Sequence, residues 1–94
     1  MEIAAANIVR SGAGHDKGKL FVVLAVEGDY LLLADGKSRK AAAPKRKKGR
    51  HVQLVSAAEH RLSETIKSNE KPTDRELRRT LAAFRDEVQP DQEG

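Results

Sequence analysis

Residues 11–19 read Ser-Gly-Ala-Gly-His-Asp-Lys-Gly-Lys, and residues 20–26 follow directly as Leu-Phe-Val-Val-Leu-Ala-Val. Glycine adopts positive φ angles at no steric cost, so the three glycines predict a sharp turn between two strands. The apolar run is rich in β-branched residues and stops at a Gly-Asp pair, residues 28–29, which is typical of a buried strand. The turn therefore holds Lys17 and Lys19 beside a rigid strand, where they are well placed to contact phosphate groups.

The segments around this stretch predict further strands. Short apolar segments separated by Gly-Asp and Asp-Gly pairs are typical of antiparallel hairpins. The predicted strands are residues 7–10, 19–27, 30–34, 37–40 and 51–55, of which 37–40 is short and exposed. Strands this closely spaced favour a small barrel or sandwich over a parallel sheet. Residues 41–49 contain a proline, a glycine and no apolar residue larger than alanine, so we predict a solvated, mobile loop there.

The side chains of a strand alternate between its two faces, which divides the central apolar run into two sets. We expect Val22 and every second residue after it, through Val26, to point into the barrel. The opposite set consists of Phe21, Val23 and Ala25, and we expect a C-terminal helix to cover part of it.

From residue 56 onward the apolar residues recur with a helical period. Residues 56–59, Ser-Ala-Ala-Glu, match a capping box and predict a short helix over about residues 57–67. Residues 73–76, Thr-Asp-Arg-Glu, match a second capping box and start a longer helix that ends before Pro90. Its apolar face consists of Leu77, Leu81, Phe84 and Val88. Two roles stay open for this face, namely packing onto the barrel or binding a protein partner.

The glycine-rich turn and its flanking strands resemble the KOW motif, in which a turn bearing Gly-Lys-Gly joins two hydrophobic strands. The match covers residues 14–26, with Ile8-Val9 ahead of it, and extends more loosely to about residue 55. It includes residues 33–36, Leu-Ala-Asp-Gly, and the lysine-arginine cluster that follows. The chain is thus similar to KOW-bearing ribosomal proteins of the archaeal and eukaryotic large subunit and to small bacterial RNA-binding relatives. The resemblance implies an SH3-like barrel whose glycine turn faces RNA.

We accordingly expect a mainly β protein. Its predicted parts are a KOW/SH3-like β-barrel over residues 1–55, a helical extension over residues 56–90 with one short and one longer helix, and a frayed tail at residues 91–94. The chain of 94 residues is enough for one small domain and contains no cysteine, which excludes disulfides and fits a reducing compartment. Its start lacks the features of a signal peptide, and no run approaches the ~20 apolar residues that span a membrane. We therefore expect a cytoplasmic protein.

The charge of the chain is distributed unevenly. The net charge is +4, but residues 1–55 carry +6 and residues 56–94 carry −2. Residues 36–51 contain eight cations and no acid. Together with the two lysines of the glycine turn, they are the candidate RNA-binding residues: Lys17, Lys19, Lys37, Arg39, Lys40, Lys45, Arg46, Lys47, Lys48 and Arg50. A solvated loop that only aids solubility is the alternative, but so many uncompensated cations favour a polyanionic partner.

The expected target is structured RNA. The chain has no tryptophan and only three aromatic residues, which disfavours base stacking across an exposed sheet and favours recognition through phosphate and shape. The resemblance narrows the target to ribosomal RNA, with ribosomal proteins as further neighbours. The alternative is an SH3-like protein-interaction module of the transcription or translation machinery, although Tyr30 is the only ring with a polar edge.

Catalytic and cofactor sites are not predicted. Aligning the glycine turn with a P-loop puts Ala13 where the first glycine belongs and Leu20 where the hydroxyl belongs. The three histidines lack the spacing of a metal site. The aspartates beside glycines, Asp16, Asp29 and Asp35, are interpreted as turn formers. We therefore expect no enzyme activity, cofactor, metal or small-molecule substrate, and no membrane partner.

Overall fold

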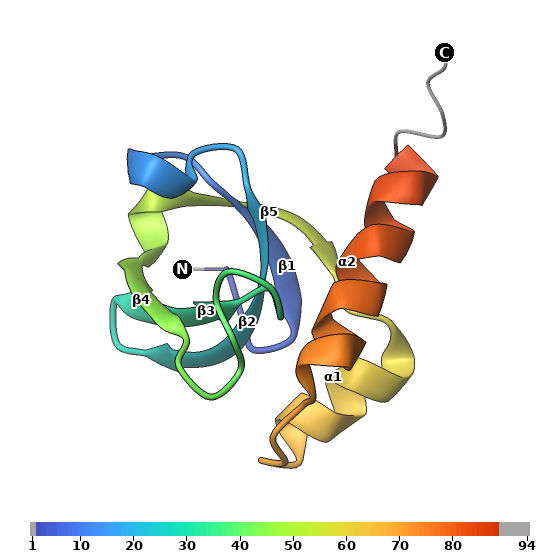
Figure 1. The fold of residues 1–94 in the computed structure, drawn as a ribbon. Coiled ribbons are helices and arrows are strands. Elements are labelled where there is room, and N and C mark those ends of the chain that lie inside the picture. Colours follow the sequence, from blue (N-terminus) through green and yellow to red (C-terminus); the bar gives the residue numbers. More distant parts are fainter. Residues whose placement is uncertain (1, 89–94) are drawn as a thin grey trace.

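A computed structural model describes residues 2–88 and shows one five-stranded antiparallel sheet with helices on one side of it (Figure 1). The strands are β1 (Asn7–Ser11), β2 (Leu20–Glu27), β3 (Tyr30–Ala34), β4 (Lys45–Lys48) and β5 (Val52–Ala57). Their order in the sheet is β4-β3-β2-β1-β5, so β4 and β5 form the two edges. The sheet curls on itself, and the prediction of a small, mainly β fold with appended helices is confirmed.

Short 3₁₀ turns and two α-helices complete the fold. The 3₁₀ turns are η1 (Gly14–Asp16), inside the glycine-rich turn, and η2 (Gly49–His51), between the two edge strands; the helices are α1 (His60–Lys67) and α2 (Asp74–Val88). Helix α2 begins as predicted, because the Thr73 and Glu76 side chains each accept a hydrogen bond from the other's backbone N–H, at 3.1 and 2.9 Å respectively.

The predicted start of the short helix is wrong by three residues. Ser56 and Ala57 belong to β5, where they pair with β1, so the helical part begins only at His60. The residue that caps α1 is Glu59, whose carboxylate accepts hydrogen bonds from the backbone N–H groups of Arg61 and Leu62. The strand extends past residue 55 because β1 offers pairing partners up to Asn7.

Two apolar clusters hold the fold together, one on each face of the sheet. The inner cluster contains no residue from the described part of either helix, so it lies on the sheet face turned away from the helices; it consists of Val9, Phe21, Val23, Leu31 and Leu33. Because the helices lie outside the curl of the sheet (Figure 1), this face is the inside of the curl. The outer cluster lies between the sheet and the helices; its buried members include Ile8, Leu20, Val22, Leu62, Ile66, Leu77 and Leu81. Both faces of the first half of β2, residues 20–23, are therefore buried under apolar side chains.

The side chains of β2 point in the opposite directions to those predicted from the sequence. Phe21 and Val23 point into the curl, while Val22 packs toward the helices. The register of β2 shifts between Val23 and Ala25, and Val26 beyond the bulge is 39% exposed. Alternation along a strand separates its two faces, but it cannot tell which face is inside when both are apolar.

The fourth strand does not lie at residues 37–40, and the predicted loop at 41–49 is wrong over β4. Residues 37–40 are folded into a compact turn because the Asp35 carboxylate accepts hydrogen bonds from the Lys37 and Arg39 backbone N–H groups and from the Ser38 hydroxyl. Burial raises the pKa of Asp35, but these hydrogen bonds outweigh it, so the pKa lies below its usual value. The edge strand forms instead at Lys45–Lys48, paired with β3.

Helix α2 packs against the sheet, which is the first of the two roles predicted for its apolar face. Leu77 and Leu81 are buried in the outer cluster, and Phe84 packs against it. The helix also anchors the turn after β3, because Asp74 accepts a hydrogen bond from the Ala41 N–H. The Val88 side chain and the predicted tail lie outside the described part of the chain. No helix within residues 2–88 is long and apolar enough to cross a bilayer.

Candidate nucleic-acid interface

The basic elements gather at the end of the molecule away from the two helices, where β4, η1 and η2 lie together (Figure 1). The register of β4 with β3 sorts its four cations into two sets. Lys45 and Lys47 lie opposite Leu33 and Leu31, on the face of the inner cluster. The other two, Arg46 and Lys48, lie on the outer face. The basic run of β4 thus has an inward and an outward half.

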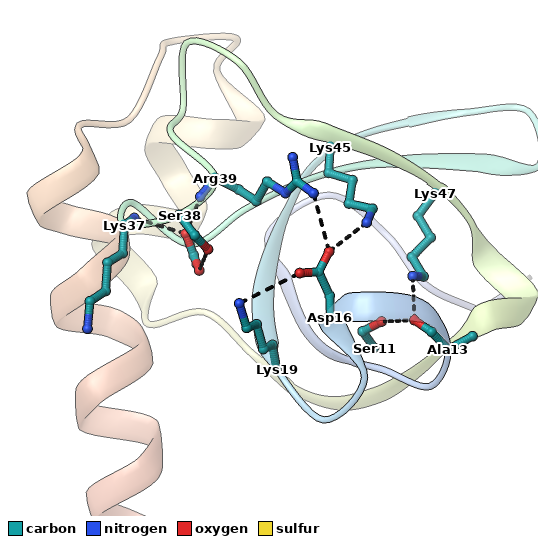
Figure 2. A network of polar contacts seen from close by, with 10 residues as sticks. Ser11, Ala13, Asp16, Lys19, Lys37, Ser38, Arg39, Lys45 and Lys47 are labelled. Atoms are coloured by element: carbon teal, nitrogen blue, oxygen red, sulfur yellow. Dashed lines mark hydrogen bonds and ion pairs between the residues drawn. The ribbon is translucent and has the colours of Figure 1, made fainter.

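The inward half is organised by Asp16, whose side chain is only 7% exposed. The Lys45 ammonium lies 2.6 Å from Asp16 Oδ2, Arg39 Nη2 lies 3.5 Å from the same oxygen, and Lys19 Nζ lies 3.7 Å from Oδ1. Figure 2 shows the carboxylate between these three cations. The hydrogen bond from Lys45, assisted by the three positive charges, outweighs burial and lowers the pKa of Asp16.

Lys47 is held in the same turn by a backbone acceptor. Its ammonium donates to the Ala13 carbonyl at 2.8 Å, and the Ser11 hydroxyl donates to that carbonyl at 3.1 Å (Figure 2). Lys45 and Lys47 therefore tie edge strand β4 to the turn between β1 and β2. Because β4 has no strand beyond it in the sheet, these side-chain contacts fasten the open edge.

The outward half surrounds the Tyr30 ring. Arg46 Cζ lies 3.7 Å from the ring centroid, and Lys48 Nζ lies 5.8 Å from it. Arg46 Nε is also 3.7 Å from Glu27 Oε1, but both side chains are more than half exposed, so this ion pair is weak. The Arg46 and Lys48 charges therefore remain at the surface of the sheet.

A basic groove runs between the glycine-rich turn and η2. Its volume is about 370 Å³, and its lining includes the cations Arg10, Lys17 and Arg50 together with the His51 imidazole. The two walls are joined by a 2.8 Å hydrogen bond from the Gly12 N–H to the His51 carbonyl. Of the residues described as lining it, none is an Asp or Glu. The groove therefore concentrates positive charge in a shape fixed by the backbone.

Arg50 connects this groove to a second hollow, which is lined by Asp29, Lys48, Gly49 and Arg50. The hollow lies at the end of β4, where the Gly49 N–H donates to the Asp29 carbonyl at 2.9 Å. Lys48 in turn shares the Tyr30 ring with Arg46. Lys17, Arg50, Lys48 and Arg46 therefore follow one another along one surface, which we call the outward surface.

The remaining predicted residues are placed differently. Lys19, Arg39 and Lys45 contact Asp16, and Lys47 contacts Ala13. Lys37 and Lys40 are exposed in the turn after β3, and Figure 2 shows the Lys37 side chain pointing away from Asp16.

Three contributors, Asp16, Arg10 and His51, are not among the residues predicted from the sequence. Asp16 was interpreted as a turn former, although an acid within a glycine-rich basic turn was a usable signal for an internal anchor. Arg10 was placed in a strand, and nothing local indicated that its side chain would line the groove.

No protein-family model matches the chain, and no curated protein matches it.

Proposed function

We propose that this protein binds structured RNA through its phosphate backbone and shape. The observation that carries the proposal is the groove between the glycine-rich turn and η2, in which Arg10, Lys17, Arg50 and His51 line one surface with no carboxylate among its described residues. Cations that neutralise phosphates release counterions, so such a surface favours polyanions with little dependence on sequence.

The rigidity of the surface supports a shaped target over a flexible polyanion. The contacts of Lys45 with Asp16 and of Lys47 with Ala13 fix β4 against the glycine-rich turn. The cations of the outward surface are therefore presented from backbone that is held in place, which suits the regular phosphate spacing of folded RNA. The resemblance of residues 14–26 to the KOW motif points to ribosomal RNA and hence to a cytoplasmic role.

The proposal is tested by removing two cations of the groove. In the variant Lys17→Gln with Arg50→Gln, both of the charges removed are exposed, so folding is preserved. We expect weaker binding to a ribosomal RNA hairpin and a salt dependence of log Kd that is flatter by about 0.7–0.9 for each phosphate that the variant no longer neutralises. The matched control, Lys67→Gln with Lys71→Gln, removes the same charge from exposed positions at and beyond the end of α1.

Two results would contradict the proposal. The first is an unchanged salt slope in the groove variant, which would reduce the groove to a solubilising surface. The second is an equal loss of affinity in the control, which would show that net charge alone sets the binding. The first result would bring forward the protein-interaction module, for which binding would depend little on salt, and the second would leave only unspecific attraction to polyanions.

A further inference from the structure

Building on the proposed RNA binding, we propose that Tyr30 and Arg46 form a stacking site for one unpaired nucleobase of the bound RNA. The sequence alone argued against base stacking, because aromatic residues are scarce. The structure places a partly exposed ring beneath a guanidinium group on the outward surface, which changes that argument.

The Arg46 guanidinium group lies over the face of the Tyr30 ring. Arg46 Cζ lies 3.7 Å from the centroid of the Tyr30 ring, the separation of two planar groups in contact. The Arg46 side chain is 57% exposed, so a large part of it is open to solvent. Nucleobases stack on both aromatic rings and guanidinium planes, and the pair offers both in one place.

The backbone supports this placement of the two side chains. Tyr30 is the first residue of β3, and Arg46 lies in the middle of β4, opposite Leu32. Both residues project from the same outer face of two paired strands, so their relative position is set by the sheet. The only charged partner of Arg46 within residues 2–88 is the exposed Glu27, at 3.7 Å, which leaves its other donors available.

The neighbouring hollow supplies a place for the backbone of the same nucleotide. It has a volume of about 430 Å³ and is lined by Asp29, Lys48, Gly49 and Arg50. Lys48 belongs to both places, because its ammonium lies 5.8 Å from the Tyr30 ring and its side chain lines the hollow. A base on Arg46 and Tyr30 therefore leaves its phosphate within reach of Lys48 and Arg50.

The Tyr30 ring has room for one base, and the chain offers no second Phe, Tyr or Trp ring for stacking. Phe21 is fully buried in the inner cluster, and Phe84 packs against the outer cluster on α2. Tyr30 is the remaining Phe, Tyr or Trp side chain of the sequence. The protein would thus read a folded RNA through phosphates and hold a single base from a bulge or a loop.

Tyr30 also provides the measurement. The chain has one tyrosine and no tryptophan, so its tyrosine fluorescence reports on this site alone. We would titrate the full chain with a ribosomal RNA hairpin that carries an unpaired loop, and with a fully paired duplex of equal length. We expect the hairpin to quench the fluorescence and the duplex to bind, through phosphates, without quenching it.

Substitutions test the stack itself. Tyr30→Leu should weaken binding of the hairpin by about 5- to 150-fold while leaving the salt slope unchanged, because it removes a stacked base and no phosphate contact. Tyr30→Phe, which keeps the ring, should bind as the wild type does. Arg46→Lys keeps the charge and removes the planar group, so it should also weaken hairpin binding. This variant tests the stack independently if Tyr30→Leu impairs folding.

The outcomes separate this inference from the proposed function. If the hairpin binds without quenching, or if Tyr30→Leu and Arg46→Lys weaken duplex and hairpin equally, the stacking site is refuted while RNA binding stands. If the wild-type protein binds neither RNA, the proposed function fails, and the stacking site with it. Selective loss of hairpin binding in both variants would establish the site.

Discussion

The ammonium group of Lys45 lies 2.6 Å from the carboxylate of Asp16, a contact between an edge strand and a turn 29 residues earlier in the chain. It shows that a run of four cations is not one functional unit. Lys45 and Lys47 hold β4 in place, whereas Arg46 and Lys48 stay at the surface. Mutations within this run should therefore separate stability from binding.

Neighbouring substitutions in β4 make the separation measurable. Lys45→Met should lower the free energy of unfolding by about 1–3 kcal/mol, because it removes the closest partner of a carboxylate held out of solvent. Arg46→Met removes the same charge from an exposed position, together with its contact with the Tyr30 ring, and should lower the free energy of unfolding by at most about 1 kcal/mol. Urea unfolding of both variants checks this difference. Equal stabilities would mean that the Asp16 contact does not fasten β4.

Acid should weaken the fold through Asp16 and Asp35, whose pKa values both lie below their ordinary value in the folded state. The unfolded chain then takes up protons before the folded chain does. The stability that these carboxylates provide is complete above the ordinary value of 3.8 and is lost as the pH falls through it toward the folded pKa values. Asp16→Asn should therefore flatten the decline in urea midpoint between about pH 5 and pH 3. If the urea midpoint of Asp16→Asn declined with pH as steeply as that of the wild type, Asp16 would not be a cause of the acid sensitivity.

The capping box of α2 should contribute to stability without affecting RNA. Thr73→Ala removes the acceptor for the Glu76 N–H and should cost about 0.5–2 kcal/mol, measured by urea unfolding. Thr73→Ser keeps the hydroxyl and is the control. The affinity for a ribosomal RNA hairpin should stay the same in both, because α2 packs on the outer cluster, whereas β4, η1 and η2 lie at the end of the molecule away from the helices (Figure 1). A loss of RNA affinity at full stability would contradict this packing role.

Two glycines with positive φ test how closely α2 docks on the turn after β3. Gly28 has a φ of +63° and open space around it, so Gly28→Ala should cost only the backbone strain of about 1–2 kcal/mol. Gly36 has a φ of +77°, and a Cβ there would collide with the Asp74 carbonyl. Gly36→Ala should therefore cost at least about 1 kcal/mol more, measured by thermal or urea unfolding. Equal costs would show that α2 can shift away without penalty.

Local patterns in the sequence were sufficient for several elements. The two-residue turn at 28–29, the strands on either side of it and the capping box at Thr73 appear where they were predicted. Each depends on residues within a few positions of one another: glycine where φ is positive, β-branched residues in a buried strand, and a Thr-Glu pair three residues apart.

Only the tertiary structure decided where the fourth strand lies and which of its cations face inward or outward. Four consecutive cations have little intrinsic strand preference. They form a strand because β3 offers a free edge and because Lys45 and Lys47 find acceptors 29 and 34 residues earlier in the chain. The total charge of residues 36–51 can be counted from the sequence. Which of these cations form internal contacts depends on the residues that the fold places next to them. Such contacts join segments that are far apart in the chain, so they cannot be predicted from local sequence patterns.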